Sequence, residues 1–223
     1  LAVNTANNNV GVGYQALFDN TSGSENTSMG RGALSNNTTA SNNVAIGYAS
    51  MNSNTTGTRN TVLGTQALQA NTTANNNTAI GYQSAYSNTT GVENVAIGRI
   101  SFYSNSTGQE NTYVGSASGY DNSTGSYNVG IGRQALTNNT TATQNTAVGY
   151  QAGYSNQTGE NNAFLGRFAG YSTTSGNNTL IGGNAGYLIT TGANNTILGR
   201  FNGNQGGLDI RTNSNQIVLS DGD

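Results

Sequence analysis

Residues 77–84 read Asn-Thr-Ala-Ile-Gly-Tyr-Gln-Ser, and close variants of this stretch recur along nearly the whole chain. Aligned on its glycine, the motif returns every 17 residues, apart from one interval of 16. A fixed internal period of this length is the sequence signature of repeat folds such as solenoids. The twelve aligned glycines are Gly13, Gly30, Gly47, Gly64, Gly81, Gly98, Gly115, Gly132, Gly149, Gly166, Gly182 and Gly199.

The first half of the repeat predicts a short strand. Numbered from its Asn, the repeat has Thr or Val at position 2, once replaced by Ala163, and an aliphatic residue or Met at position 4. Alternation of this kind is typical of a strand with one buried face, so we expect the position-4 side chains to form an internal column. Gly at position 5 suits a corner where the backbone must bend or approach a neighbour closely.

The second half predicts another strand and a turn. Position 8 is small in eleven copies, with Asn202 as the exception, and positions 12 to 15 read Asn-Thr-Thr-Gly or a close variant. Positions 7 to 9 suggest a second short strand, and the Asn-Thr-Thr-Gly segment is a turn by its residue chemistry. Frequent glycine and β-branched residues disfavour helix. The expected fold is an all-β, parallel β-solenoid of about twelve coils over residues 1–203.

Stacking the coils about 4.8 Å apart would place the position-1 asparagines in one column. Each amide could then bond to the next amide or to a backbone group of a turn. Ligand binding is the alternative role, but a ligand site does not need twelve copies. The twelve are Asn9, Asn26, Asn43, Asn60, Asn77, Asn94, Asn111, Asn128, Asn145, Asn162, Asn178 and Asn195.

Positions 9 and 10 compensate for each other in size. A large position 9 precedes a smaller or polar residue, as in Leu68-Gln69, whereas Gly at position 9 precedes Tyr, as in Gly153-Tyr154. Leu17-Phe18 is bulky at both positions. This apolar stripe could face partner chains along a common axis, or it could pack within the chain across a corner. Both interpretations stay open.

The pentapeptides at residues 43–47 and 94–98, Asn-Val-Ala-Ile-Gly, resemble the head repeats of trimeric autotransporter adhesins. The longer form at residues 77–84 is similar to repeats of bacteriophage tail fibres, and residues 215–223 resemble the exit segment of such fibres. The resemblance implies a left-handed β-roll, a side-by-side homotrimer and an extracellular place on a virion tail fibre or a bacterial surface. It also implies a host receptor, glycan or protein, as partner. Residues 204–223 would lead into a downstream domain that assists trimerisation.

Composition excludes several classes of function. The chain has 7% charged residues, against roughly 25% in typical proteins, and it has neither Cys nor His. Thiolate and imidazole chemistry is therefore absent, and the lack of Lys disfavours nucleic-acid binding. No apolar run approaches the ~20 residues that span a bilayer. We expect no enzymatic activity and no cofactor or metal, since Glu93 and Glu110 are a lone carboxylate pair and residues 221–223 lack a full calcium-ligand pattern.

Position 6 carries most of the chemistry that the chain retains. Five of the seven Arg occupy it, and no two adjacent coils both carry Arg there. A Tyr next to an Arg in this column can attract the guanidinium through a cation–π contact. The column could bind a sugar or an acidic ligand, or it could be a solvated ladder with its charges spaced apart. The candidate glycan contacts are Tyr14, Arg31, Tyr48, Tyr82, Arg99, Arg133, Tyr150 and Arg167.

Two further patterns carry alternative interpretations. Nine Asn-x-Ser/Thr sequons share position 12, from Asn20 to Asn156, and we take them as turn residues rather than glycosylation sites. Thr pairs such as Thr55-Thr56 would form a hydroxyl array, which makes an ice-binding solenoid the third alternative after the fibre segment and the adhesin head. The chain begins at Leu1 rather than Met, so we expect a segment of a longer protein.

Overall fold

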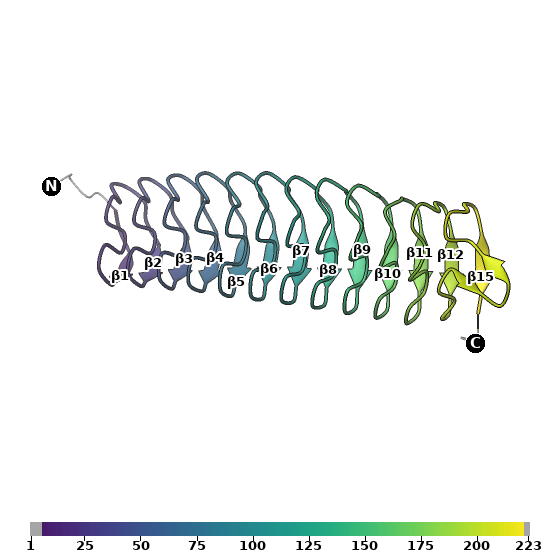
Figure 1. Ribbon diagram of the computed structural model, residues 1–223. Coiled ribbons are helices and arrows are strands. Elements are labelled where there is room, and N and C mark those ends of the chain that lie inside the picture. Colours follow the sequence, from purple (N-terminus) through teal and green to yellow (C-terminus); the bar gives the residue numbers. More distant parts are fainter. Residues whose placement is uncertain (1–5, 221–223) are drawn as a thin grey trace. The chain divides into compact units, whose positions relative to one another are not determined.

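The computed structural model describes residues 6–220 and confirms a parallel β-solenoid of about twelve coils, each of about 17 residues (Figure 1). These residues contain no helix. The chain divides into two compact units, residues 1–110 and residues 111–223. Within each unit, every coil contributes one three-residue strand, and each strand lies beside that of the next coil.

Unit 1 contains six parallel strands in sequential order. Their registers join residues one repeat apart, for example Val44 with Thr61. The repeat therefore sets the register, because equal positions of successive coils hydrogen-bond to each other. The strands are β1 (Val10–Val12), β2 (Thr27–Met29), β3 (Val44–Ile46), β4 (Thr61–Leu63), β5 (Thr78–Ile80) and β6 (Val95–Ile97).

Unit 2 follows the same plan with one interruption near its end. After β12 the chain makes an antiparallel hairpin and then adds one more parallel strand, which joins Thr196 to Ile217. Residues 210–220 of the expected exit segment therefore continue the solenoid. The strands are β7 (Thr112–Val114), β8 (Val129–Ile131), β9 (Thr146–Val148), β10 (Ala163–Leu165), β11 (Thr179–Ile181), β12 (Thr196–Leu198), β13 (Asn204–Gln205), β14 (Leu208–Asp209) and β15 (Ile217–Leu219).

The strands present the opposite face to the core from the one that the sequence suggested. In β4, Val62 at position 3 is fully buried, whereas Leu63 at position 4 is 49% exposed. The middle residue is the buried one in every strand from β2 to β12. Because neighbouring side chains of a strand point to opposite faces, positions 2 and 4 both point outward. The prediction of an internal position-4 column is therefore wrong.

The second strand predicted at positions 7 to 9 is also wrong, because these residues form a turn. Ala49 and Met51, at positions 7 and 9, have φ of 50° and 46°. Left-handed backbone costs a non-glycine residue about 1–2 kcal/mol. Here it directs alternate N–H groups to neighbouring coils: Ala49 donates to the carbonyl of Arg31 at 3.0 Å, and Met51 donates to that of Ala67 at 3.1 Å.

The core is filled jointly by positions 3 and 9. Tyr113 at position 3 is fully buried, and a Cβ added to Gly119 at position 9 of that coil would lie 2.5 Å from its ring. Ala96 reverses the sizes, with Phe102 at position 9 fully buried. Position 9 therefore packs inside its own chain, which corrects the hypothesis that this part of the stripe faces partner chains.

Candidate functional site

The position-1 asparagines form an interior hydrogen-bonded column. The backbone N–H and Nδ2 of Asn43 donate to Oδ1 of Asn26, at 3.0 Å and 3.3 Å. Its Nδ2 also crosses the coil to the carbonyl of Gly57 at 2.9 Å. Eleven of the twelve are at most 2% exposed, and Asn9, in the first coil, is half-buried. Side chains buried this deeply tie coils together and offer nothing to a ligand.

A second asparagine column lies at position 12, where the sequence suggested only turn residues. Nδ2 of Asn54 donates to Oδ1 of Asn37 at 2.9 Å and to the carbonyl of Gly57 at 3.0 Å. Asn71 continues the column with a 2.8 Å bond to Oδ1 of Asn54. These asparagines head the sequons and are buried, so their amides are closed to modification in the folded chain. The exact 17-residue recurrence of this Asn was the available sequence signal.

The position-5 glycines are required for two reasons. All twelve have positive φ, and Gly81, at 128°, is representative. A Cβ on Gly81 would also lie 2.5 Å from the carbonyl oxygen of Gly98 in the next coil. Side chains are thus excluded both by conformation and by the approach of the neighbouring backbone. The corner that these glycines make separates the strands from the wall of positions 6 to 10.

The threonine hydroxyls at positions 13 and 14 have different roles. At position 13, Oγ1 of Thr55 donates to the carbonyl of Thr72 at 3.0 Å, and Thr38 makes the same bond to Thr55. Thr56 at position 14 is exposed. One column of each pair is therefore used to join coils, which leaves a single exposed column in place of the paired array that an ice-binding face would use.

All eight candidate glycan contacts at position 6 are exposed. In unit 1, the Arg31 guanidinium lies 5.9 Å from the ring centroids of both Tyr14 and Tyr48. In unit 2, Arg133 lies 5.7 Å from the ring of Tyr150. Each of these distances is within the ~6 Å range of a cation–π contact. The column thus presents alternating aromatic and cationic side chains to solvent.

Stacked tyrosines at position 10 border this column. In unit 1, the rings of Tyr86 and Tyr103 are 5.1 Å apart and nearly parallel. In unit 2, Tyr171 stacks between Tyr154 and Tyr187 with both centroid distances at 5.0 Å. Desolvation, together with the neighbouring tyrosines, raises the pKa of the Tyr171 hydroxyl above its ordinary value. The Tyr171 hydroxyl therefore remains a protonated donor at neutral pH.

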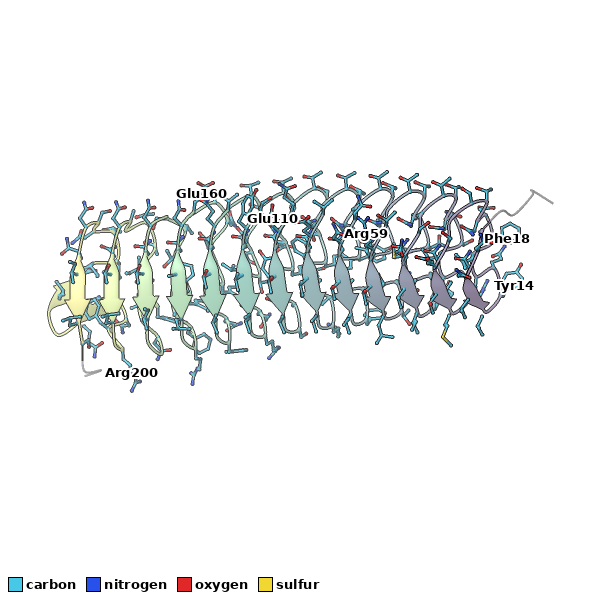
Figure 2. The ribbon with its side chains drawn as sticks, turned by 180° about the vertical axis from the view of Figure 1, so that it is seen from behind. Tyr14, Phe18, Arg59, Glu110, Glu160 and Arg200 are labelled. Carbon is cyan, nitrogen blue, oxygen red and sulfur yellow. The ribbon has the colours of Figure 1, made fainter. Side chains whose placement is uncertain are left out.

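A cavity of about 410 Å³ opens in the position-6 wall of unit 2. Arg200 projects on this side of the coils, whereas Glu160 lies on the opposite edge (Figure 2). Sequence reasoning placed Arg167 and Arg200 in one column but missed the remaining lining residues. Two features of the sequence could have indicated the cavity. Gly183 interrupts the position-6 column, and Asn202 is the exception to the small residues at position 8. The lining consists of Arg167, Phe168, Asn184, Tyr187, Arg200, Asn202 and Gln205.

The acidic side chains do not form a comparable site. Glu93 and Glu110 are exposed in successive coils of unit 1. Asp209 forms an exposed ion pair with Arg211 at 2.7 Å, and the hydrogen bonds from Arg211 hold the Asp209 pKa below its ordinary value. Within residues 6–220, no group of three or more potential metal-ligating side chains is found. Residues 221–223, considered above for calcium, lie outside the described residues.

No protein-family model, curated protein or solved structure matches this chain. The part of the chain that the structure describes also holds no helix long and apolar enough to cross a membrane. The repeat and the geometry of its faces are therefore the basis for proposing a function.

Proposed function

We propose that this chain is a structural and adhesive fibre segment that acts as a homotrimer and without enzymatic activity. Its place would be extracellular, in a phage tail fibre that supports or performs attachment to a host receptor. The observation that carries this proposal is the strand face, by which we mean the outward side chains at positions 2 and 4 of the parallel strands in each unit.

In the twelve repeats the strand face carries an aliphatic residue or Met at position 4 and Thr, Val or Ala at position 2, and it is uncharged in both units. Val12 and Leu63 of unit 1 are 54% and 49% exposed, and Leu165 and Ile217 of unit 2 are 48% and 80% exposed. No position 2 or 4 in any coil carries a charge. Soluble monomers rarely expose contiguous apolar patches larger than a few hundred Å². A covering partner accounts for such a face better than solvent does.

Further copies of the same chain are the occupant that fits this face best. The aliphatic side chains recur once per coil, so a matching surface needs the same spacing along its length. Another copy supplies that spacing, and closed symmetric association is the usual way in which identical surfaces pair. The low charge of the chain, 7% of residues, also removes the repulsion that would oppose side-by-side packing.

The other faces support the fibre and adhesive roles. The buried position-1 asparagines and the backbone ladders join each coil to the next, and the position-12 asparagines add bonds between coils of unit 1, which suits a repeat array whose neighbours contribute to stability. The exposed tyrosines and arginines at position 6 supply aromatic surface and hydrogen-bond donors for a receptor. A bacterial trimeric adhesin head is the alternative, favoured by the pentapeptides at residues 43–47 and 94–98. At positions 13 and 14, the first hydroxyl of each threonine pair, such as that of Thr55, is used in a bond to the next coil, which argues against the ice-binding alternative.

Sedimentation equilibrium of the purified chain tests the proposal. We expect a species of three times the 22.8 kDa chain mass at micromolar concentration. The fluorescently labelled trimer should bind to cells of a susceptible bacterial host. A chain that sediments as a monomer over this concentration range contradicts the homotrimer, and a trimer that binds no cell surface contradicts the adhesive role.

A further inference from the structure

The position-6 column of unit 2 contains a gap at Gly183. Every other coil carries a side chain there, whether Tyr, Arg, Thr65 or Ser116. Gly183 does not have the left-handed backbone of the position-5 glycines, and a Cβ added to it would meet no atom within 4 Å. Neither conformation nor crowding therefore requires glycine at this position. What its missing side chain provides is open space.

The gap lies between two arginines. Arg167 and Arg200 occupy position 6 of the coils before and after Gly183, so their Cα atoms are separated by two coil spacings, or about 10 Å. Another part of the same column serves as a comparison. Arg133 and Arg167 are also two coils apart, but Tyr150 fills the space between them and contacts Arg133 at 5.7 Å. Between Arg167 and Arg200, by contrast, residue 183 has no side chain, and both arginines line the 410 Å³ cavity.

The two guanidinium groups are available to an anion. Arg167 is held against the ring of Phe168, 4.6 Å from its centroid, and both arginines are exposed. Within residues 6–220, the one ion pair is Asp209 with Arg211, so neither cavity arginine is neutralised by a described carboxylate. Guanidinium groups match carboxylate oxygens in geometry and bind them with charge-assisted hydrogen bonds. This charge pattern favours an anionic ligand.

The remaining walls favour a sugar ring. Phe168 and Tyr187 pack edge to face at 5.8 Å and supply aromatic surface. Asn184, Asn202 and Gln205 supply amides, each with donors and an acceptor that can pair with hydroxyl groups. Oδ1 of Asn202 already accepts the Asn204 N–H at 2.8 Å, so its amide N–H groups are the part that can serve a ligand. The cavity volume falls within the roughly 300–1,000 Å³ of small-ligand pockets.

We propose that this cavity, between Arg167 and Arg200 at Gly183, binds a saccharide unit that carries a carboxylate. The carboxylate binds the guanidinium groups, the face of the sugar ring packs on Phe168 and Tyr187, and the hydroxyl groups bond to the amides. Glycine at residue 183 admits the ring where the other coils exclude it. This inference rests on the proposed adhesive function and assigns its receptor class, an acidic glycan.

Titrations of the full chain with two matched sugars test the assignment. Methyl β-D-glucuronide and methyl β-D-glucoside differ only in the carboxylate, and binding can be followed by saturation-transfer NMR and chemical-shift titration. We expect the glucuronide to bind at least tenfold more tightly. Arg167→Gln, Arg200→Gln and Gly183→Tyr should each weaken glucuronide binding at least tenfold, the last because it restores the filled arrangement seen at Tyr150.

Two variants of unit 1 serve as matched controls. Arg59→Gln removes the same charge from an exposed arginine outside position 6, and Thr65→Tyr adds the same ring at position 6. Both should leave glucuronide binding unchanged, with circular dichroism reporting the fold of every variant. Equal binding of the glucoside, or full binding by Gly183→Tyr, overturns the site. Tighter binding of glucose 6-phosphate than of the glucuronide overturns the assignment to a carboxylate.

Sedimentation of the same samples separates this inference from the proposed function. A trimer without glucuronide binding removes the site and leaves the fibre proposal standing. A monomer that binds the glucuronide removes the homotrimer and leaves the site standing.

Discussion

At the scale of single residues, the interior of each coil is one space shared by positions 3 and 9. Where position 3 is Tyr113 or Phe164, position 9 of that coil is glycine, and where position 3 is Ala96, position 9 is Phe102. Protein interiors are close-packed, so one site can hold a large side chain only if the other is small. The glycines at position 9 are therefore required by volume, whereas those at position 5 are required by backbone geometry.

Gly119→Ala tests this volume rule. Its Cβ would lie 2.5 Å from the Tyr113 ring, which is fully buried and cannot move into solvent. Overpacking of this kind costs about 1–3 kcal/mol, and we expect a matching loss of stability in thermal and urea unfolding. Tyr113→Ser combined with Gly119→Leu, which copies the sizes of Ser28 and Leu34, should recover most of the loss.

Gly206→Ala is the control for the backbone contribution to this cost. Gly206 has the same φ of 60° as Gly119, yet nothing lies within 4 Å of an added Cβ. Its substitution should cost only the left-handed strain, about 1 kcal/mol. Equal destabilisation by the two alanines would show that volume does not govern position 9.

At the scale of the elements, the coils are joined by columns of equal residues as much as by strands. Each strand has only three residues, so the sheet alone ties a small part of every coil to its neighbours. The position-1 asparagines join the remainder, and in unit 1 the position-12 asparagines add to these bonds. Both columns reach the same carbonyl, as Asn43 and Asn54 do at Gly57. A buried amide that makes several bonds costs much more to remove than an exposed one.

Asn54→Leu should therefore destabilise unit 1 strongly. The substitution keeps the branched shape of the side chain but removes the bonds that Asn54 makes to Asn37 and Gly57 and receives from Asn71, leaving buried polar atoms unpaired. We expect a cost of about 2 kcal/mol or more, read as faster backbone hydrogen exchange in the surrounding coils and a lower melting midpoint. Asn36→Leu, at an exposed neighbouring position, should change stability by less than about 0.5 kcal/mol. Similar effects of both variants would contradict a stabilising role for the column.

The sequence was sufficient for the period, the parallel register and the strand at positions 2 to 4, because these follow from a repeat that stacks equal positions of successive coils. It misled on which strand face is buried. Of positions 3 and 4, position 4 is the more consistently hydrophobic, which predicted that it would be buried. The buried residue is instead at position 3, which varies from glycine to Tyr113. The pairing of position 3 with position 9 was visible as anticorrelated size. The turn at positions 7 to 9 was not, since Leu and Met in left-handed backbone follow from coil-to-coil bonding rather than from local preference.

Only part of the candidate site was predictable from the sequence. The exposed column at position 6 was predictable from the repeat, because equal repeat positions of successive coils lie above one another and form a line on the surface. The cavity was not, since Phe168, Asn184 and Tyr187 come from two repeat positions and two coils. Gln205 belongs to the hairpin that interrupts the period. The signals in the sequence were the missing side chain at residue 183 and Asn202, the exception to the small residues at position 8.

At the scale of the whole chain, the coils offer different chemistry on different faces. The strand face is uncharged and carries aliphatic side chains together with threonines, and the position-6 wall beyond the glycine corner carries the arginines and tyrosines. When further copies of the chain cover the strand face, the position-6 wall remains accessible to a receptor. Assembly and adhesion would then depend on separate residues and should respond to separate substitutions.

Charges placed on the strand face should dissociate the trimer without unfolding the chain. The triple variant Met29→Asp, Leu63→Asp and Leu165→Asp alters three exposed position-4 residues in non-adjacent coils. Desolvating these carboxylates in an interface is strongly unfavourable, so we expect sedimentation to report one chain mass instead of three. The unfolding transition of each chain should still be cooperative, because these side chains contribute little to the interior.

Two controls complete the argument. Thr39→Asp, Thr73→Asp and Thr158→Asp add the same three charges at exposed position 14 and should leave the mass trimeric. Val62→Asp places the charge one residue away from Leu63 but in the core, where an uncompensated charge costs about 3–5 kcal/mol, and it should disrupt folding itself. If the strand-face variant remained trimeric, the copies would have to meet on another face. If Val62→Asp were tolerated as well as Leu63→Asp, the orientation of the strands would be the reverse of the one described.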